Sequence, residues 1–136
     1  MKIVNIFIVL ILSILSLNTF AKHTITDNFP LLAGQQVRLV GFYGFGIYTI
    51  DSTIVSQQGE FKLKYADKNR SMGYLAADDN KAYFVVLADE DIELKGEALN
   101  VAESVETIKG KENQLFVQYA IEYPKREQAL SAWIYL

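Results

Sequence analysis

The residues that could support chemistry in this chain are one histidine, several acidic side chains and a glycine-rich segment. The segment GFYGFGIYTIDST contains Gly44-Phe45-Gly46. A dinucleotide loop needs G-x-G-x-x-G opening a helix, and a phosphate loop ends in Gly-Lys-Ser/Thr. Here a strand-like alternation follows instead, so the glycines predict a turn or bulge between Val40 and Ile47.

The polar candidates lack the partners that catalysis or metal binding requires. His23 is the only histidine and there is no cysteine, so we expect neither a zinc site nor a Ser-His-Asp relay, and a solvated His23 near the mature N-terminus. Asp51 has no second group at a suitable spacing. We expect it to be an outward strand residue near Lys62 or Lys64.

Two acidic clusters, Asp78-Asp79-Asn80 and Asp89-Glu90-Asp91, could be taken for calcium loops. Calcium loops place oxygen ligands at alternate positions, with a turn glycine and a distal Glu, and neither cluster has that set. Asp and Asn are also common turn residues, so both clusters predict turns between strands. We expect no catalytic residue, no cofactor and no metal in this chain.

Two groups of apolar residues are candidates for a ligand or partner surface. We favour a structural role for the segment that holds the first group, but aromatic side chains of a bent hairpin cannot all point inward, so its exposed members are candidates to contact a sugar, a peptide or a partner domain. The second group forms an apolar stripe that packs either on this chain's own sandwich, which we favour, or in a groove of a partner. The first group is Phe42, Tyr43, Phe45 and Tyr48, and the second is Leu130, Trp133 and Ile134.

The N-terminal segment predicts export. Residues 1–21 combine an early Lys, a long apolar run and a small-residue end, which is typical of a secretory signal peptide cleaved after Ala21. The alternative is an uncleaved membrane anchor. After cleavage we expect no stable membrane insertion and a location in a periplasm or outside the cell. With no cysteine, the exported chain has no disulfide and no redox couple of its own.

The charge distribution argues against nucleic acid as a partner. The formal net charge is −3, and the Lys and Arg residues are scattered among acidic ones. Nucleic acid binding needs clustered positive charge to neutralise phosphates.

Residues 22–110 read as an antiparallel β-sandwich of seven to eight strands, transthyretin-like or immunoglobulin-like, because short alternating runs are separated by regular turn signals. YTIDSTIVSQQGEFKLKY predicts a hairpin over 48–65 around Ser56–Gly59. AYFVVLA and DIELKG predict a second hairpin across Asp89-Glu90. The remaining expected strands are FPLLA, QVRLVGF, MGYLAAD and ESVETIK.

Residues 111–136 have a helical period. Pro124 disfavours helix at the preceding residue and suits the start of a new one, so we expect a helical pair, Glu112–Glu122 and Lys125–Tyr135. The sequence ends in WIYL, an apolar patch that needs a cover. We favour the interpretation that this segment is the start of a longer protein.

Six segments of the chain, taken in order, resemble a known domain family. They are GQQVRLVG, YTIDST, GEFKLKY, MGYL, YFVVLADEDIELKG and KGKENQLFVQYAIEYPKREQALSAW. The family is the domain of unknown function that precedes thioredoxin-like modules in exported thiol-disulfide interchange proteins of Bacteroidota. The resemblance covers roughly 29–136 and implies a β-sandwich, then a helical segment leading toward a thioredoxin fold. Such a module, or another envelope protein, is the partner that it implies. No thioredoxin module and no cysteine occur here, so none of that redox activity transfers to a position of this sequence.

These observations predict a non-catalytic, exported accessory or binding module of the cell envelope. Two alternatives stay open. One is a fragment of a thioredoxin-like oxidoreductase whose catalytic module lies beyond residue 136. The other is a stand-alone binder of glycans or peptides.

Overall fold

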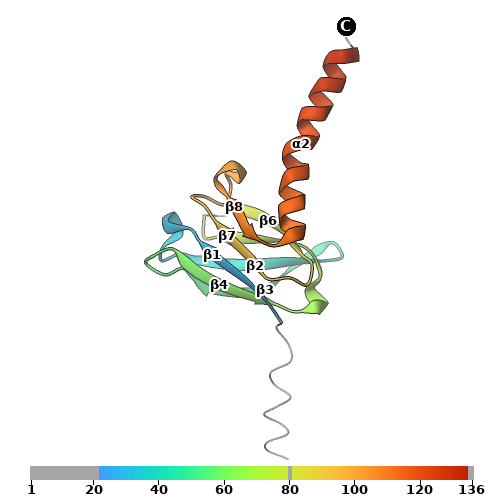
Figure 1. Ribbon diagram of the computed structural model, residues 1–136. Coiled ribbons are helices and arrows are strands. Elements are labelled where there is room, and N and C mark those ends of the chain that lie inside the picture. The colour runs from blue at the N-terminus through green and yellow to red at the C-terminus, as the bar shows by residue number, and fades with distance from the viewer. Residues whose placement is uncertain (1–21, 80, 135–136) are drawn as a thin grey trace, which may run out of the picture.

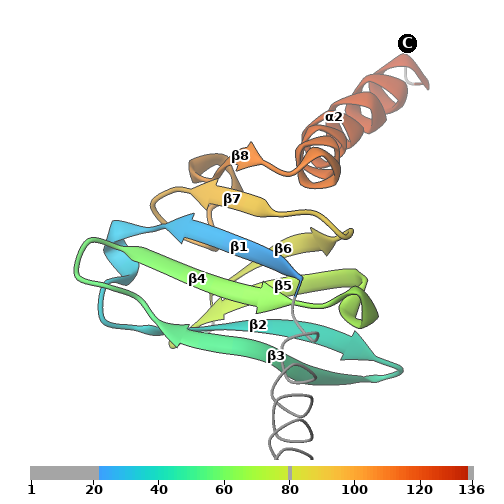
Figure 2. The same ribbon diagram turned by 60° about the horizontal axis from the view of Figure 1, so that its bottom comes forward.

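The computed structural model describes residues 22–79 and 81–134, which form a β-sandwich and one long helix (Figures 1 and 2). The mainly-β sandwich of eight strands confirms the predicted fold class. The predicted signal peptide, residues 1–21, lies outside the described residues. The strands are β1 (His23–Asn28), β2 (Gln36–Tyr43), β3 (Gly46–Ile54), β4 (Glu60–Tyr65), β5 (Ser71–Ala77), β6 (Ala82–Leu87), β7 (Ile92–Lys95) and β8 (Glu106–Lys109). The helices are the 3-10 turns η2 (Pro30–Leu32), η3 (Asp67–Asn69) and η4 (Ala102–Ser104), and α2 (Lys111–Ile134).

Each sheet has four strands. One has the order β4-β1-β7-β8 and the other the order β3-β2-β5-β6. All neighbouring strands are antiparallel except β1 and β7, which are parallel. Alternate residues of both sheets point inward, which is how period-2 alternation buries one face of each strand. The largest fully buried side chains are Tyr65, Phe29, Ile25, Leu39, Leu63, Leu75, Leu87, Ile92, Leu94 and Leu99.

The glycine-rich segment forms the turn and the bulge that its sequence predicts. β2 and β3 make a hairpin in which Tyr43 pairs with Gly46, and Gly44 has a φ of 58° at the first position of the two-residue loop. Glycine is favoured there because its φ is positive. A register shift between Leu39 and Val40 marks a bulge that leaves Ile50 of β3 without a direct partner.

The predicted hairpin over 48–65 is wrong. β3 lies in one sheet and β4 in the other, so the chain crosses the sandwich at Ser56–Gly59 instead of returning beside itself. The turn itself is present, since the Gly59 N–H donates to the Ser56 carbonyl at 2.9 Å. Alternation determines which face of a strand is buried but not which strand pairs with it, so a hairpin and a sheet-to-sheet crossing look alike in sequence.

Three further strand predictions need correction. β6 and β7 also belong to different sheets, so Asp89-Glu90 connects the sheets and is not a hairpin loop. FPLLA is no strand, because Pro30–Leu32 forms a 3-10 turn with the buried Leu32 anchoring it to the core. ESVETIK is a strand only from Glu106 onward, after η4. Proline suits the first position of such a turn, a signal that favours η2 over a strand.

The predicted helical pair is a single helix. α2 runs through Pro124 for 24 residues. Proline cannot donate to the carbonyl four residues earlier, which belongs to Ala120. Ala120 is exposed, so water can replace the missing donor at this point of the helix. The helix leaves the sandwich beside β8 and β6 and points away from it (Figures 1 and 2).

Candidate functional site

The aromatic residues of the glycine-rich segment separate into three environments. Tyr43 and Phe45 stand at the tip of the β2–β3 hairpin, 83% and 113% exposed. Phe42 lies on the outer face of its sheet against Tyr74, with ring centroids 5.7 Å apart. Tyr48 covers Gly41, and its hydroxyl accepts a hydrogen bond from the Asn69 amide at 3.1 Å. Tyr43 and Phe45 are thus the freest of the four, whereas Tyr48 is part of the structure.

The outer face of the β3-β2-β5-β6 sheet has a row of aromatic rings. Tyr74 packs between Phe42 and Phe84, and the centroids of Tyr74 and Phe84 are 6.0 Å apart in an edge-on arrangement. Phe84 and Phe42 remain 53% and 44% exposed. The sequence pattern did not single out this row, although Tyr74 and Phe84 occupy alternate, outward positions of β5 and β6.

A groove of about 680 Å³ lies between α2 and the β6 end of this row. Phe84 of β6 and residues around η4 form one wall, and Phe116, Ala120 and Ile121 of α2 form the other. The groove thus continues the aromatic row toward the helix.

The first turn of α2 is fixed to the sandwich by two side chains. The Glu90 carboxylate accepts the backbone N–H groups of Lys111 and Glu112 at 3.0 and 2.9 Å, which satisfies two of the free donors at the helix start. The buried Asn113 amide pairs with both backbone groups of Val86 on β6, accepting from its N–H and donating to its carbonyl at 2.8 Å each. The sandwich therefore determines where the helix begins and how its first turn is held.

Glu90 is held in turn by Tyr65. The Tyr65 hydroxyl donates to the Glu90 carbonyl and accepts from the Glu90 N–H. Burial, followed by the Glu90 charge, raises the pKa of Tyr65, which keeps this hydroxyl protonated as a donor. Sequence reasoning assigned Glu90 to a turn, which is right, but a capping role toward residues 111 and 112 has no sequence signal.

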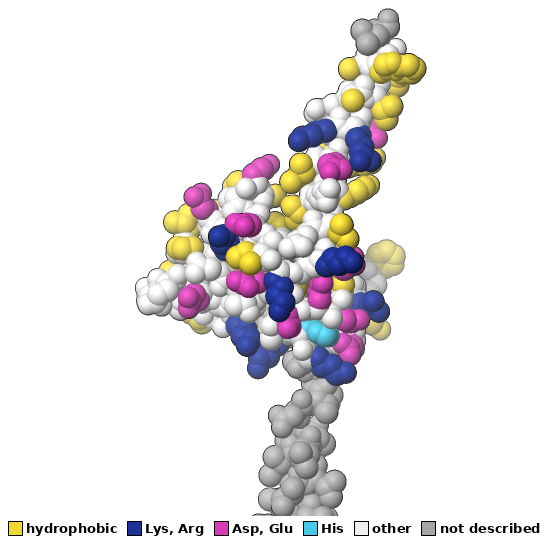
Figure 3. Space-filling model, viewed as in Figure 1, with side chains coloured by type: hydrophobic (Ala, Val, Ile, Leu, Met, Phe, Trp, Pro, Cys, Tyr) yellow, Lys and Arg dark blue, Asp and Glu magenta, His cyan; other side chains and the backbone are white. Residues whose placement is uncertain are grey.

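The second half of α2 is exposed to solvent. We call residues 121–134 the arm. Every arm residue except Glu122 is exposed. Leu130, Trp133 and Ile134 are 56%, 74% and 73% exposed, so the favoured prediction that they pack on the chain's own sandwich is wrong. Figure 3 shows hydrophobic side chains along the projecting helix.

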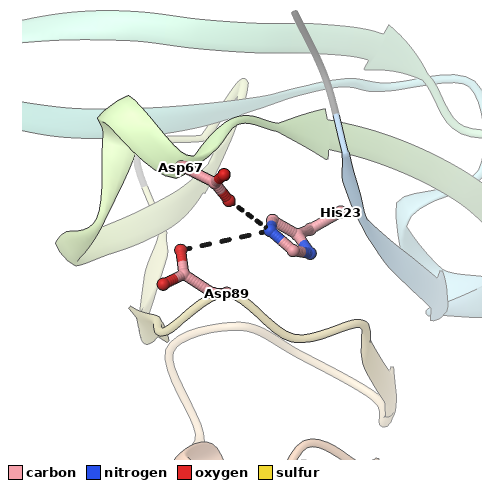
Figure 4. A group of neighbouring side chains, drawn as sticks. All are labelled: His23, Asp67 and Asp89. Carbon is pink, nitrogen blue, oxygen red and sulfur yellow. Dashed lines mark hydrogen bonds and ion pairs between the residues drawn. The ribbon is translucent and has the colours of Figure 1, made fainter. Parts of the chain in front are cut away.

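His23 is not a solvated residue, contrary to the prediction. Its ring nitrogen Nε2 lies 2.7 Å from Oδ1 of Asp67 and 4.0 Å from Oδ1 of Asp89 (Figure 4). The three ligand atoms lie within 4.8 Å of one another, close enough to hold a cation. Lys22 and Arg70 bind the same two carboxylates at 3.0 and 3.4 Å.

The charges around His23 are therefore already balanced by cationic side chains. The hydrogen bond from His23, then that from Lys22, lowers the pKa of Asp67. The Thr24 N–H does the same for the pKa of Asp91 by donating to its carboxylate at 2.9 Å. Asp89 and Asp91 thus tie the β6–β7 connection to the start of β1. This arrangement describes an ion-pair network that joins β1, η3 and the connection.

Asp51 also joins the sheets. Its carboxylate accepts the Lys64 N–H of β4 at 2.9 Å and the adjacent Ser52 N–H at 2.9 Å. The expected neighbour Lys64 is correct, but the side chain is not outward, because the bulge at Ile50 turns Asp51 toward the other sheet. The prediction of an outward Asp51 missed this bulge.

The predicted turn at Asp78-Asp79-Asn80 is present at Asp78 and Asp79, with the Asp79 carboxylate accepting the Lys81 N–H at 3.1 Å, and Asn80 lies outside the described residues. That bond lowers the pKa of Asp79.

Asp27 of β1, which the sequence analysis did not single out, points into the core of the sandwich and is 3% exposed. Neither of its carboxylate oxygens has a hydrogen-bond partner among the described residues, and burial raises its pKa well above the usual value.

Within the described part of the chain, no helix is both long and apolar enough to cross a lipid bilayer. No protein-family model and no curated protein matches this chain. The candidate surfaces are therefore defined by their geometry: the hairpin tip, the aromatic row with its groove, and the arm.

Proposed function

We propose that this chain is a non-catalytic, exported binding module in which the sandwich presents the arm of α2 to a partner protein. The observation that supports the proposal is the contrast within one helix. Glu90 and Asn113 hold its first turn by hydrogen bonds of 2.8–3.0 Å, whereas Leu130, Trp133 and Ile134 at its far end are uncovered. A helix anchored at one end and apolar at the other is suited to bind in a groove or against another helix.

Energetics favour a covered arm. Pro124 in a helix interior costs about 3 kcal/mol relative to alanine. The local contacts of the arm include the Glu122–Arg126 ion pair at 3.1 Å, the hydrogen bond from Gln118 to Glu122 at 3.1 Å and the Tyr119–Tyr123 ring pair at 5.5 Å, each of a kind that contributes about 0.2–0.5 kcal/mol. Complete burial of a side chain such as Leu130 contributes about 1.5–3 kcal/mol, so a bound partner would offset the cost of Pro124.

Site-specific photo-crosslinking in living cells of the native host tests this proposal. A photoreactive residue at Leu130 should give covalent protein adducts, whereas the same residue at Ser131 should give few, since Ser131 lies beside the exposed apolar side chains but is not one of them. The absence of adducts at both positions would refute the proposal. The intact mass of the same protein tests the alternative, because a mass well above that of this chain would show that the chain is part of a longer protein, as a fragment of a thioredoxin-like oxidoreductase requires.

The hairpin tip supports a second candidate, the binding of a glycan or peptide. Tyr43 and Phe45 are almost fully exposed beside the Phe42–Tyr74 ring pair, and exposed aromatic faces stack on sugars and peptides. The double change Tyr43→Ser and Phe45→Ser should abolish such binding in a glycan or peptide array and leave the melting temperature nearly unchanged. A large loss of stability would instead show that the two side chains are structural.

A further inference from the structure

All the large exposed apolar side chains of α2 except Ile121, which lines the groove, form one stripe. At 3.6 residues per turn its members fall within about 100° of the helix circumference, on the side opposite the groove. They are all 49–74% exposed. The apolar stripe consists of Leu115, Tyr119, Tyr123, Leu130, Trp133 and Ile134.

The stripe is large enough for a specific interface with a copy of itself. From the exposed fractions, and taking roughly 200 Å² for an aromatic and 100 Å² for an aliphatic side chain, it offers roughly 550 Å² per copy. Two copies would bury about 1,100 Å², just above the area of about 1,000 Å² that separates specific interfaces from incidental contacts. A pair of this size is expected to be weak, with a dissociation constant of about micromolar.

Charge at the centre of the stripe selects the occupant. Arg126 lies within the stripe, and Glu122 lies at its edge, one turn earlier. Arg126 already binds Glu122 of its own helix at 3.1 Å, so a purely apolar partner would bury this ion pair without any further hydrogen-bond partner, which is costly. A partner that brings a second carboxylate and a second guanidinium to the middle of the stripe would extend the pair into a network.

A second copy in the antiparallel direction supplies that carboxylate. When two stripes are aligned about a point between residues 124 and 125, Tyr119 of one lies opposite Leu130 of the other, and Leu115 lies opposite Ile134. Arg126 then lies over Tyr123 of the other copy and within one residue of its Glu122. Because a two-fold pair repeats each contact, both charges of both copies are matched.

We infer that α2 pairs with α2 of a second copy through the apolar stripe, antiparallel, with Glu122 and Arg126 meeting across the pair. This inference rests on the proposed function, since it names the partner of the arm. It makes the chain a dimer whose two sandwiches lie at opposite ends of the helix pair.

One property of the chain simplifies the first experiment. Trp133 is the only tryptophan, so intrinsic tryptophan fluorescence reports on the stripe alone. Sedimentation velocity and Trp133 emission are measured over a range of concentrations on the full gene product as the cell processes it. The expected result is a monomer–dimer equilibrium in which Trp133 emission shifts to shorter wavelength as dimer forms. Leu130→Glu should raise the dissociation constant about 30-fold or more, whereas Ser131→Glu, with the same added charge beside the stripe, should leave it nearly unchanged.

The second experiment tests the antiparallel direction. Glu122→Arg makes both central positions positive, and Arg126→Glu makes both negative, so each variant alone should associate more weakly. A mixture of the two should recover dimer, because each charge of one copy then faces its opposite on the other. The double variant, Glu122→Arg with Arg126→Glu in one chain, is the control. If dimer recovers in the double variant but not in the mixture, the two residues act within one helix, and the proposed arrangement is overturned.

The outcomes separate this inference from the proposed function. A chain that is monomeric at all concentrations with solvent-exposed Trp133 overturns the second copy as partner. So does a Trp133 shift produced by phosphatidylglycerol vesicles but not by protein concentration. Crosslinking at Leu130 to a different protein in the host would then still support the proposed function, whereas an adduct at twice the mass of the chain supports both.

Discussion

Asp27 gives a test of how the core tolerates a carboxyl group. Its side chain is 3% exposed and without a hydrogen-bond partner among the described residues, and burial raises its pKa well above the usual value. The folded state therefore holds the proton more tightly than the unfolded state, whose reference pKa is about 3.9. Stability should be highest below that value and should fall as pH rises toward the folded-state pKa, by about 1.4 kcal/mol per pH unit.

Asp27→Asn removes the titration and keeps the shape. We expect the variant and the parent to have similar stability near pH 4 and to diverge above it, with the variant more stable at neutral pH. Asp27→Leu removes the unpartnered polar group as well and should add about 1–3 kcal/mol. Glu97→Gln, which neutralises an exposed carboxylate, is the control and should run parallel to the parent.

Urea unfolding followed by circular dichroism at several pH values measures these differences. Trp133 is a poor probe here because it lies on the arm and not in the core. Three carboxylates with lowered pKa values, Asp67, Asp79 and Asp91, stabilise the fold, and this stabilisation is lost as pH falls through their folded-state pKa values. Their contribution is the same in the variant and the parent, so comparing the two proteins at each pH removes it. Parallel curves for Asp27→Asn and the parent would show that Asp27 is ionised and solvated in the fold, and would refute the reasoning.

Three other changes probe the anchoring of the fold and the helix. Gly59→Ala should lower stability by more than about 3 kcal/mol in urea unfolding, because φ is 83° and the new Cβ would lie 2.5 Å from the Pro30 backbone; an unchanged midpoint would contradict the turn geometry. Asn113→Leu should cost about 2–4 kcal/mol and speed hydrogen exchange at Val86, since both backbone groups of Val86 lose their partner. Pro124→Ala should increase helicity at 222 nm and slow exchange over 121–134, by up to about 3 kcal/mol in local stability, and no change would mean that the arm is already fully covered.

The sequence predicts the strands better than their partners. The hydrophobic alternation of Phe61, Leu63 and Tyr65 locates β4 and its buried face, as the structure confirms. The same alternation is compatible with a hairpin and with a crossing between sheets, which is why residues 48–65 were assigned to the wrong pairing. The bulge at Ile50 adds a residue to β3 and reverses its faces from there on, which period-2 reasoning cannot anticipate.

The candidate surfaces could be predicted only in part, because local spacing does not show which distant segments pack together. Spacing placed Leu130 and Trp133 on one stripe, but only the packing of the whole chain reveals that no element of the sandwich reaches them. The anchors of α2 depend on contacts between distant segments, such as Asn113 with Val86, and nothing local marks them. Side chains such as Asn113, which bind the backbone of a distant segment, are therefore the ones that the sequence does not reveal.

Side chains that bond to the backbone of the edge strands favour the side chains of α2, and not a strand edge, as the contact surface. Free edges invite pairing with another chain. In this fold the Asn113 amide occupies the backbone groups of Val86 on β6, and the Gln114 side chain lies 3.4 Å from the carbonyls of Thr107 and Ile108 on β8. On the opposite side the Asp51 carboxylate takes the N–H of Lys64 on β4. The sandwich thus interrupts three of its four edge strands, β6, β8 and β4, with its own side chains, while the arm stays exposed. A strand added to one of these three edges would have to displace those bonds, whereas a helix that binds the arm would displace only water.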